Sequence, residues 1–188
     1  MKYLTYLITI LTSLNSLGQV NGTIVDERDS TTYGTVTIDS LVWMTENLNF
    51  ETTGAFQHPD SCNTCGLLYT YSAAKDVCPY GFRMPSESDW SELFTSLGGQ
   101  VEVEEYGTYY HGIINLLQSE KLLDLRYCGN YDGDENDFKY CGTYGAYWYL
   151  NYNEFKGIHF EKSQYQDWIG TVMGDQYSGL SVRCVKDL

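Results

Sequence analysis

The stretch from residue 78 to residue 90 constrains the fold most, because it joins a cysteine, a turn and the clearest helix start in the chain. Ser86 can accept a hydrogen bond at the N-cap of a helix, and Asp89 lies three residues later as its reciprocal partner. Four apolar residues follow at the i, i+3, i+4, i+7 spacing of one buried helical face: Trp90, Leu93, Phe94 and Leu97. We therefore expect an amphipathic helix from Ser86 to Leu97, with Cys78 available to tie it to a distant segment.

Other segments also have the periodicity of regular structure. Residues 36–44 have the pattern of two strands joined by an Asp-Ser turn. Residues 69–77 and 113–123 are predicted to be helical, the second because Ile113, Leu116 and Leu117 share one face. Apolar and polar residues alternate again from residue 142 to residue 160, and a closing strand is predicted at 180–185.

The N-terminal residues have the composition of a secretion signal. Lys2 precedes an apolar run at residues 3–11, and small residues near position 18 can form a cleavage site. A membrane anchor is the weaker alternative, because the run is short and interrupted by threonines. We expect a signal peptide at residues 1–18, a polar leader at 19–32 and one domain at 33–188.

The charge of the chain limits its partners. It has 11 basic and 25 acidic residues and a net charge of −14, so it repels phosphate backbones and anionic lipids. No nucleic-acid partner is expected, and no membrane insertion once the signal is removed. The 18 tyrosines suit either binding surfaces or buried positions in which the hydroxyl has a partner.

Six cysteines behind a secretion signal predict a disulfide framework. Cys128 and Cys141 flank a polar loop and are predicted to pair across it. Cys62 and Cys65 form a CxxC motif, but a zinc site would need further ligands at suitable spacing, and a thioredoxin-like motif would follow a strand and open a helix. A local Cys62–Cys65 disulfide is the preferred interpretation.

Three stretches together carry a resemblance to a known family. Residues 66–74 with the run CPYGFRMPSESDWSELF, residues 33–49 with a Trp-Met-x-Glu-Asn-Leu signature, and residues 179–187 resemble the Fibrobacter succinogenes major paralogous domain, found in secreted and surface bacterial proteins. The resemblance implies an α+β, C-type-lectin-like fold with two to three helices packed on short antiparallel sheets, stapled by disulfides. It implies a Cys78–Cys184 disulfide but no reaction, because the family has no agreed activity.

The candidate ligand-binding surface surrounds the loop between Cys128 and Cys141. Its proposed members combine aromatic density with acidic groups: Tyr127, Tyr131, Asp132, Asp134, Tyr140, Tyr144, Tyr147 and Tyr149. A calcium site at Asp132, Asp134 and Asn136 is an alternative, but the sixth and twelfth loop positions lack the Gly and Glu of an EF-hand. A solvated acidic hairpin tip is preferred, and no cofactor is expected.

The sequence lacks known motifs both for sugar binding and for catalysis. The sugar-binding triplets of C-type lectins are absent, and the family's Trp-Ser-Ser-Thr-like strand is replaced by WYLN at 148–151. Formylglycine-generating enzymes, which the implied fold resembles, use two cysteines shortly before the closing strand, and this chain has none between Cys141 and Cys184. We expect a secreted or surface-bound, non-catalytic binding or adhesion module for a glycan or protein, with the periplasm as an alternative location. A degenerate relative of the formylglycine-generating group with oxidoreductase-type activity and a passive structural component of a surface assembly remain open.

Overall fold

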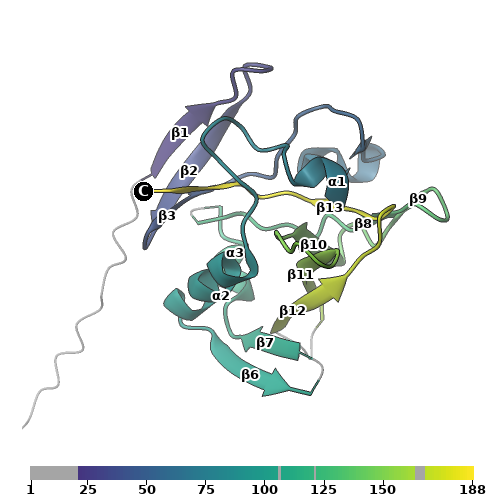
Figure 1. Cartoon of the computed structure of the whole chain (residues 1–188). Helices are drawn as coiled ribbons and strands as arrows, with labels where there is room; N and C mark the ends of the chain where they lie inside the picture. The colour runs from purple at the N-terminus through teal and green to yellow at the C-terminus, as the bar shows by residue number, and fades with distance from the viewer. Residues whose placement is uncertain (1–20, 106, 121, 164–167) are drawn as a thin grey trace, which may run out of the picture.

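The computed structural model describes residues 21–105, 107–120, 122–163 and 168–188, and within them short helices pack on two β-sheets (Figure 1). The smaller sheet is antiparallel and has the strand order β1 (Asn21–Val25), β2 (Thr32–Ile38), β3 (Leu41–Met44) and β14 (Val185–Asp187). It therefore joins the first described strand and the last strand of the chain. The predicted signal peptide, residues 1–18, lies outside the described residues, whereas part of the predicted polar leader forms β1.

The larger sheet is mixed and runs through the centre of the molecule. Its main path is β4-β5-β13-β10-β11-β12-β7-β6, with the β8–β9 hairpin attached to β13. The pairing between β10 and β13 is parallel, and its neighbours on this path are antiparallel. In path order the strands are Ala55–Gln57, Leu67–Thr70, Gly179–Ser181, Tyr144–Trp148, Lys156–Glu161, Trp168–Met173, Gly107–His111 and Gln100–Glu104, and the hairpin comprises β8 (Asn130–Asp132) and β9 (Asp137–Lys139).

The predicted central helix is present as α2 (Glu87–Ser96), with Ser86 as its N-cap. The Ser86 hydroxyl accepts a hydrogen bond from the Asp89 backbone N–H at 3.2 Å, and the Asp89 carboxylate accepts one from the Ser86 N–H at 2.7 Å. This reciprocal pair satisfies two backbone donors at the helix start, as the sequence predicts.

The two other predicted helices are much shorter than their sequence patterns indicate. α1 (Tyr71–Ala74) begins late because residues 69–70 belong to β5, and the Thr70 side chain caps it. α3 (Ile114–Leu117) ends early because the chain turns back, with the Leu125 N–H donating to the Leu117 carbonyl at 2.9 Å. The leucines that follow this turn are buried in the core although the helix does not continue through them. A 3-10 segment, η1 (Asp60–Cys65), precedes β5.

Strand β10 is buried on both faces, which explains why the core forms two main clusters. Tyr147 and Tyr149 pack in the cluster that contains α2, whereas Ala146 and Trp148 pack in the cluster that contains α1. Successive strand residues point to opposite faces of a sheet, so both alternating sets of β10 are covered. Tyr144, at the start of the strand, is only half-buried.

Three disulfides link the fold, and they correct the predicted pairing. Cys78–Cys184 is present, as the family resemblance implies, with a Cα–Cα distance of 5.8 Å. The other two bonds are Cys62–Cys141 and Cys65–Cys128, so the predicted Cys62–Cys65 and Cys128–Cys141 pairs are wrong. Cys62 has non-helical backbone angles within η1, and both cysteines of the CxxC motif bond to the base of the β8–β9 hairpin. These bonds are typical of an oxidising compartment.

Candidate functional site

The polar residues of the recognised motifs form two groups of hydrogen bonds on either side of a disulfide, which we together call the motif hub: Asn47, Arg83, Asp89, Arg183 and the Cys78–Cys184 disulfide. Arg183 is 0 % exposed and donates hydrogen bonds to the Asn47 side-chain oxygen at 2.5 Å and to the Met44 carbonyl at 3.3 Å. Arg83 bonds to Asp89 at 2.5 Å and to the C-terminal Asp187 at 2.7 Å. The hub therefore includes residues of all three motifs, and Asn47 borders a pocket of about 300 Å³.

Electrostatics in the hub favour a structural role. Burial lowers the pKa of Arg183, against the opposing influence of Tyr147. The Asn47 amide also donates to the Cys65 carbonyl at 2.9 Å. Removing a hydrogen-bond acceptor from a buried cation lowers the stability of the fold strongly. These residues therefore hold the sheets together.

The predicted tyrosine surface is not a single surface. Tyr147 and Tyr149 are 0 % and 1 % exposed, respectively. Tyr131 is also buried and stacks on Phe56 with ring centroids 3.8 Å apart, while Tyr127 is half-buried and packs against Phe160. Of the six proposed tyrosines, Tyr140 is exposed, and Tyr127 and Tyr144 are half-buried. The six tyrosines therefore do not form one shared surface, because they occupy both faces of the sheet, and their role in binding stays a prediction.

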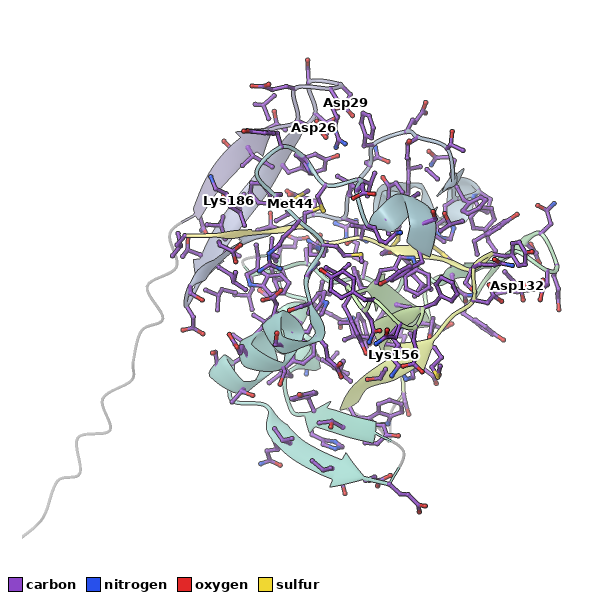
Figure 2. All side chains as sticks on the ribbon, in the orientation of Figure 1. Asp26, Asp29, Met44, Asp132, Lys156 and Lys186 are labelled. Carbon is purple, nitrogen blue, oxygen red and sulfur yellow. A yellow bond between two sulfur atoms is a disulfide. The ribbon has the colours of Figure 1, made fainter. Side chains whose placement is uncertain are left out.

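The acidic residues of the predicted surface lie at the tip of the β8–β9 hairpin. Figure 2 shows Asp132 at the opposite end of the molecule from Lys186 in the small sheet. The Asp132 carboxylate accepts hydrogen bonds from the backbone N–H groups of Asp134 and Glu135, both at 3.1 Å, and the Asn136 side-chain oxygen accepts one from Tyr131. These oxygens are used within the hairpin itself. In the part of the chain that the structure describes, no cluster of three His, Cys, Asp or Glu side chains could hold a metal ion.

A continuous row of rings crosses the large sheet, and we call it the aromatic face: Tyr140, Tyr144, His159, Trp168 and Tyr109. The successive ring centroids lie 6.1, 5.5, 5.1 and 5.2 Å apart. Tyr140 is 66 % exposed, and the other four are half-buried. The row follows β10, β11, β12 and β7, so each strand contributes a ring to the same face.

A glycine on β12 makes this row possible. A Cβ atom at Gly170 would lie 2.8 Å from the Trp168 ring and 3.0 Å from the Tyr109 ring. Because the glycine has no side chain, these two rings approach each other edge to face across the strand, a favourable arrangement for aromatic pairs.

The aromatic face also contains a groove, and the charges around this groove nearly balance. Tyr140 and Tyr144 line a groove of about 480 Å³ together with Glu161 and Lys162, one acid and one base. Burial lowers the pKa of His159, although Glu161 opposes this, so its imidazole is neutral at neutral pH. Its Nδ1 atom is buried and has no hydrogen-bond partner among the described residues.

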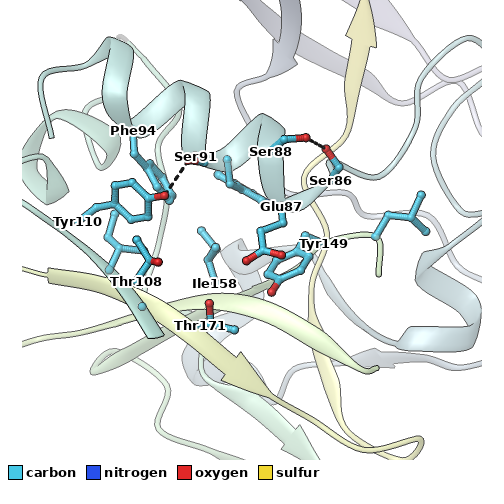
Figure 3. Close-up of a pocket in the computed structure, with 14 residues that line it drawn as sticks. Ser86, Glu87, Ser88, Ser91, Phe94, Thr108, Tyr110, Tyr149, Ile158 and Thr171 are labelled. Carbon is cyan, nitrogen blue, oxygen red and sulfur yellow. Dashed lines mark hydrogen bonds between the residues drawn. The ribbon is translucent and has the colours of Figure 1, made fainter. Parts of the chain in front are cut away.

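A separate pocket of about 540 Å³ lies between α2 and the opposite face of the large sheet (Figure 3). We call it the α2 pocket. Its walls combine hydroxyl groups with apolar side chains and one carboxylate, among them Ser86, Glu87, Ser91, Phe94, Thr108, Tyr110, Tyr149, Ile158 and Thr171. Tyr110 donates a hydrogen bond to the Ser91 hydroxyl at 2.7 Å across one wall. The capped start of α2 and the strand ends of the sheet thus position polar groups around one cavity.

Sequence reasoning missed most of these residues. Tyr109, His159 and Trp168 lie far apart in the sequence and share no motif, and only the strand register brings them together. Ser86 was identified as a helix cap, but nothing in the helix pattern indicates that its neighbour Glu87 borders a cavity. Counting tyrosines locates aromatic-rich segments but does not tell which face of the sheet each ring occupies.

Comparison with known proteins identifies the domain but not a ligand. The sequence profile of the Fibrobacter succinogenes major domain matches residues 36–186. No curated protein and no solved structure matches the chain. Among the described residues, no helix has the length and apolar character needed to cross a bilayer.

Proposed function

The chain belongs to the Fibrobacter succinogenes major domain family, and we propose that it is a secreted or surface-bound, non-catalytic module whose aromatic face binds a neutral polysaccharide. The observation that carries this proposal is the row of five rings across four strands of the large sheet. Tyrosine and tryptophan rings offer flat apolar surfaces with a polar edge, which suits both faces and hydroxyls of sugars. A row that crosses several strands fits an extended chain better than a single sugar.

The charge of the protein supports a neutral ligand. With a net charge of −14, the chain repels anionic polymers over the distance of the Debye length. The groove beside Tyr144 contains both Glu161 and Lys162 and has no excess of positive charge. Hydroxyl-rich neutral chains therefore meet no electrostatic barrier there.

The disulfides support the proposed location and argue against the enzymatic alternative. None of the six cysteines, all of which lie in described ranges, is free. An oxidoreductase of the formylglycine-generating type would need reactive thiols, so we retain the binding role. Association of the first and last strands in the small sheet, together with the Cys78–Cys184 bond, also supports our assignment of the fold as C-type-lectin-like. Superposition of an experimental structure on lectin-like domains tests that assignment.

Affinity electrophoresis through soluble polysaccharides tests the binding role. The panel contains neutral β-glucan, xylan and mannan, with polygalacturonate as the anionic member. We expect retardation by at least one neutral polymer and none by polygalacturonate. Tyr140→Ala and Trp168→Ala should weaken binding about tenfold, equivalent to about 1.4 kcal/mol.

Tyr80→Ala is the matched control, because Tyr80 is fully exposed and lies outside the aromatic face. It should bind like the native protein, and thermal unfolding checks that each variant is folded. A folded protein that none of the neutral polymers retards, or equal retardation of the Trp168→Ala variant, would contradict the proposal. The first result would favour a passive structural component, which co-purification with the cell envelope can identify.

A further inference from the structure

The α2 pocket differs from the aromatic face in both position and chemistry. Thr171 and Ile169 line it, and they alternate along β12 with Trp168, which belongs to the aromatic face. Because alternate strand residues point to opposite faces, the pocket opens on the other side of the sheet. A ligand in it would not contact the row of rings.

Two buried donors at this pocket have no hydrogen-bond partner among the described residues. The Tyr149 hydroxyl and the Trp90 Nε1–H both belong to side chains that are 1 % exposed and line the pocket. Thr171 lies close enough to oppose the rise in the pKa of Tyr149, but no hydrogen bond of normal geometry joins the two hydroxyls. Figure 3 shows Glu87, Tyr149 and Thr171 around the same opening. Buried polar groups in folded proteins are nearly always paired, so unpaired donors at a cavity indicate a partner from outside the chain.

The Tyr149 hydroxyl is suited to donate a hydrogen bond rather than to ionise. Burial, aided by the nearby Glu87 carboxylate, raises the pKa of Tyr149 to about 12. At neutral pH it therefore keeps its proton. The Glu87 carboxylate at the start of α2 is exposed and can only accept. The two groups together match a ligand that both accepts and donates, as a sugar hydroxyl does.

From this geometry we infer that the α2 pocket is a second binding site, for a single neutral sugar ring or a polyol of that size. Its volume of about 540 Å³ is typical of small-ligand pockets. Hydroxyl groups of Ser91, Thr108 and Thr171 border it, while Phe94 and Ile158 provide apolar surface for the carbon skeleton. An anion is excluded because Glu87 is the charged residue of its lining and lies on the approach.

A small ammonium ion is the competing ligand for Glu87, and two features disfavour it. The N-terminal end of α2 carries the positive end of the helix dipole, which opposes a cation at that position. The unpaired donors of Tyr149 and Trp90 need an acceptor, which an ammonium group does not supply. A neutral hydroxyl compound satisfies both the carboxylate and the donors.

Saturation-transfer NMR on the whole protein tests the inference. The probes are glucose, galactose, mannose, xylose and N-acetylglucosamine, with ethylamine, whose ammonium form has no acceptor, as the cationic competitor. We expect at least one sugar to bind with a Kd near the millimolar range and ethylamine not to bind. Tyr149→Phe and Glu87→Gln should each weaken sugar binding at least tenfold.

Two controls separate this site from the proposed polysaccharide site. Tyr149→Phe removes a hydroxyl that has no partner, so its melting temperature should not fall and a loss of binding cannot be attributed to unfolding. Tyr140→Ala should leave monosaccharide binding unchanged while weakening polysaccharide binding. The inference is overturned if no sugar binds, if ethylamine alone binds, or if the Tyr149→Phe variant binds sugar as tightly as the native protein. None of these results depends on whether the aromatic face binds a polymer.

Discussion

The motif hub and the two candidate ligand surfaces use polar groups in opposite ways. In the hub, Arg183 donates to three acceptors, Met44, Asn47 and Asp124, although its Nε–H has no partner among the described residues, and Arg83 bonds to two carboxylates. At the α2 pocket and the aromatic face, donors on Tyr149 and a ring nitrogen of His159 are buried without partners among the described residues. The motifs that identify the family thus explain the architecture, while the surfaces with unmet hydrogen-bonding capacity are the places to look for function.

The two ligand surfaces differ in their relation to the recognised motifs, because the α2 pocket takes Glu87, Trp90 and Phe94 from the helix motif whereas the aromatic face lies outside the motifs. The rings of the aromatic face belong to residues 109–168, between the helix motif and the closing strand. The family resemblance therefore bears on the fold of this chain more than on the aromatic face.

Removing the Cys78–Cys184 disulfide should produce the largest loss of stability and test whether the hub holds the fold. The bond closes a loop with a sequence separation of 106 residues. The chain-entropy model gives a loss of about 4.7 kcal/mol for a loop of roughly this size. Urea unfolding of the Cys78→Ala/Cys184→Ala variant measures it. A loss below about 1 kcal/mol would mean that this bond is not central to the fold.

Asn47→Ala should cost about 3 kcal/mol, because it leaves the buried Arg183 guanidinium without its shortest hydrogen bond. The matched control is Asn49→Ala, whose side chain is exposed on the same segment. That change should alter the free energy of unfolding by no more than about 0.5 kcal/mol. Equal effects of the two substitutions would remove the distinction between hub and surface.

Asp89 should make the stability of the hub depend on pH. Burial raises its pKa, but hydrogen bonds from Arg83 and Ser86 outweigh burial and lower the pKa below 3.8. Because the folded state holds the carboxylate ionised more readily than the unfolded state does, this stabilisation is complete above the unfolded pKa and is lost as pH falls through the folded one. Comparing the native protein with Asp89→Asn, which should cost about 1 kcal/mol at pH 7, we expect the difference to shrink below pH 4. A constant difference down to pH 2 would contradict this role.

The smallest effect should come from a pair of buried tyrosines that differ in hydrogen bonding. Tyr69 has hydrogen bonds with the Phe50 backbone N–H and carbonyl at 2.9 and 3.0 Å, whereas the Tyr149 hydroxyl is unpaired. Tyr69→Phe should therefore cost about 1 kcal/mol, and Tyr149→Phe should be neutral or slightly stabilising. Thermal unfolding of both variants measures the contrast. A clear destabilisation by Tyr149→Phe would show that its hydroxyl serves the fold.

The sequence predicts the structure correctly where the interactions that determine it are local. The capping box of Ser86 and Asp89 involves residues three positions apart, and α2 begins and ends where the pattern predicts. The Cys78–Cys184 bond could be predicted because the family resemblance supplied the long-range information. By contrast, the partners of Cys62 and Cys65 depend on how η1 meets the base of the β8–β9 hairpin, and the spacing of a CxxC motif does not contain that geometry.

At the candidate site, too, local sequence patterns do not contain the long-range geometry that decides the outcome. Tyr144 and Tyr149 look equivalent in the sequence, yet one borders the aromatic face and the other lines the α2 pocket. Which face a strand residue occupies follows from strand register, and which face is covered follows from the placement of α2. Neither is encoded in the local composition that predicted a single tyrosine surface.

Hydrogen exchange measured by mass spectrometry, with and without the neutral polysaccharide that retards the protein most, tests the central claim most directly. The account predicts that bound polymer slows exchange in peptides from β10, β11, β12 and β7, while peptides of the motif hub exchange as in the free protein. Slower exchange confined to the hub, or no difference anywhere in the chain, would contradict the division between a structural hub and an aromatic binding face.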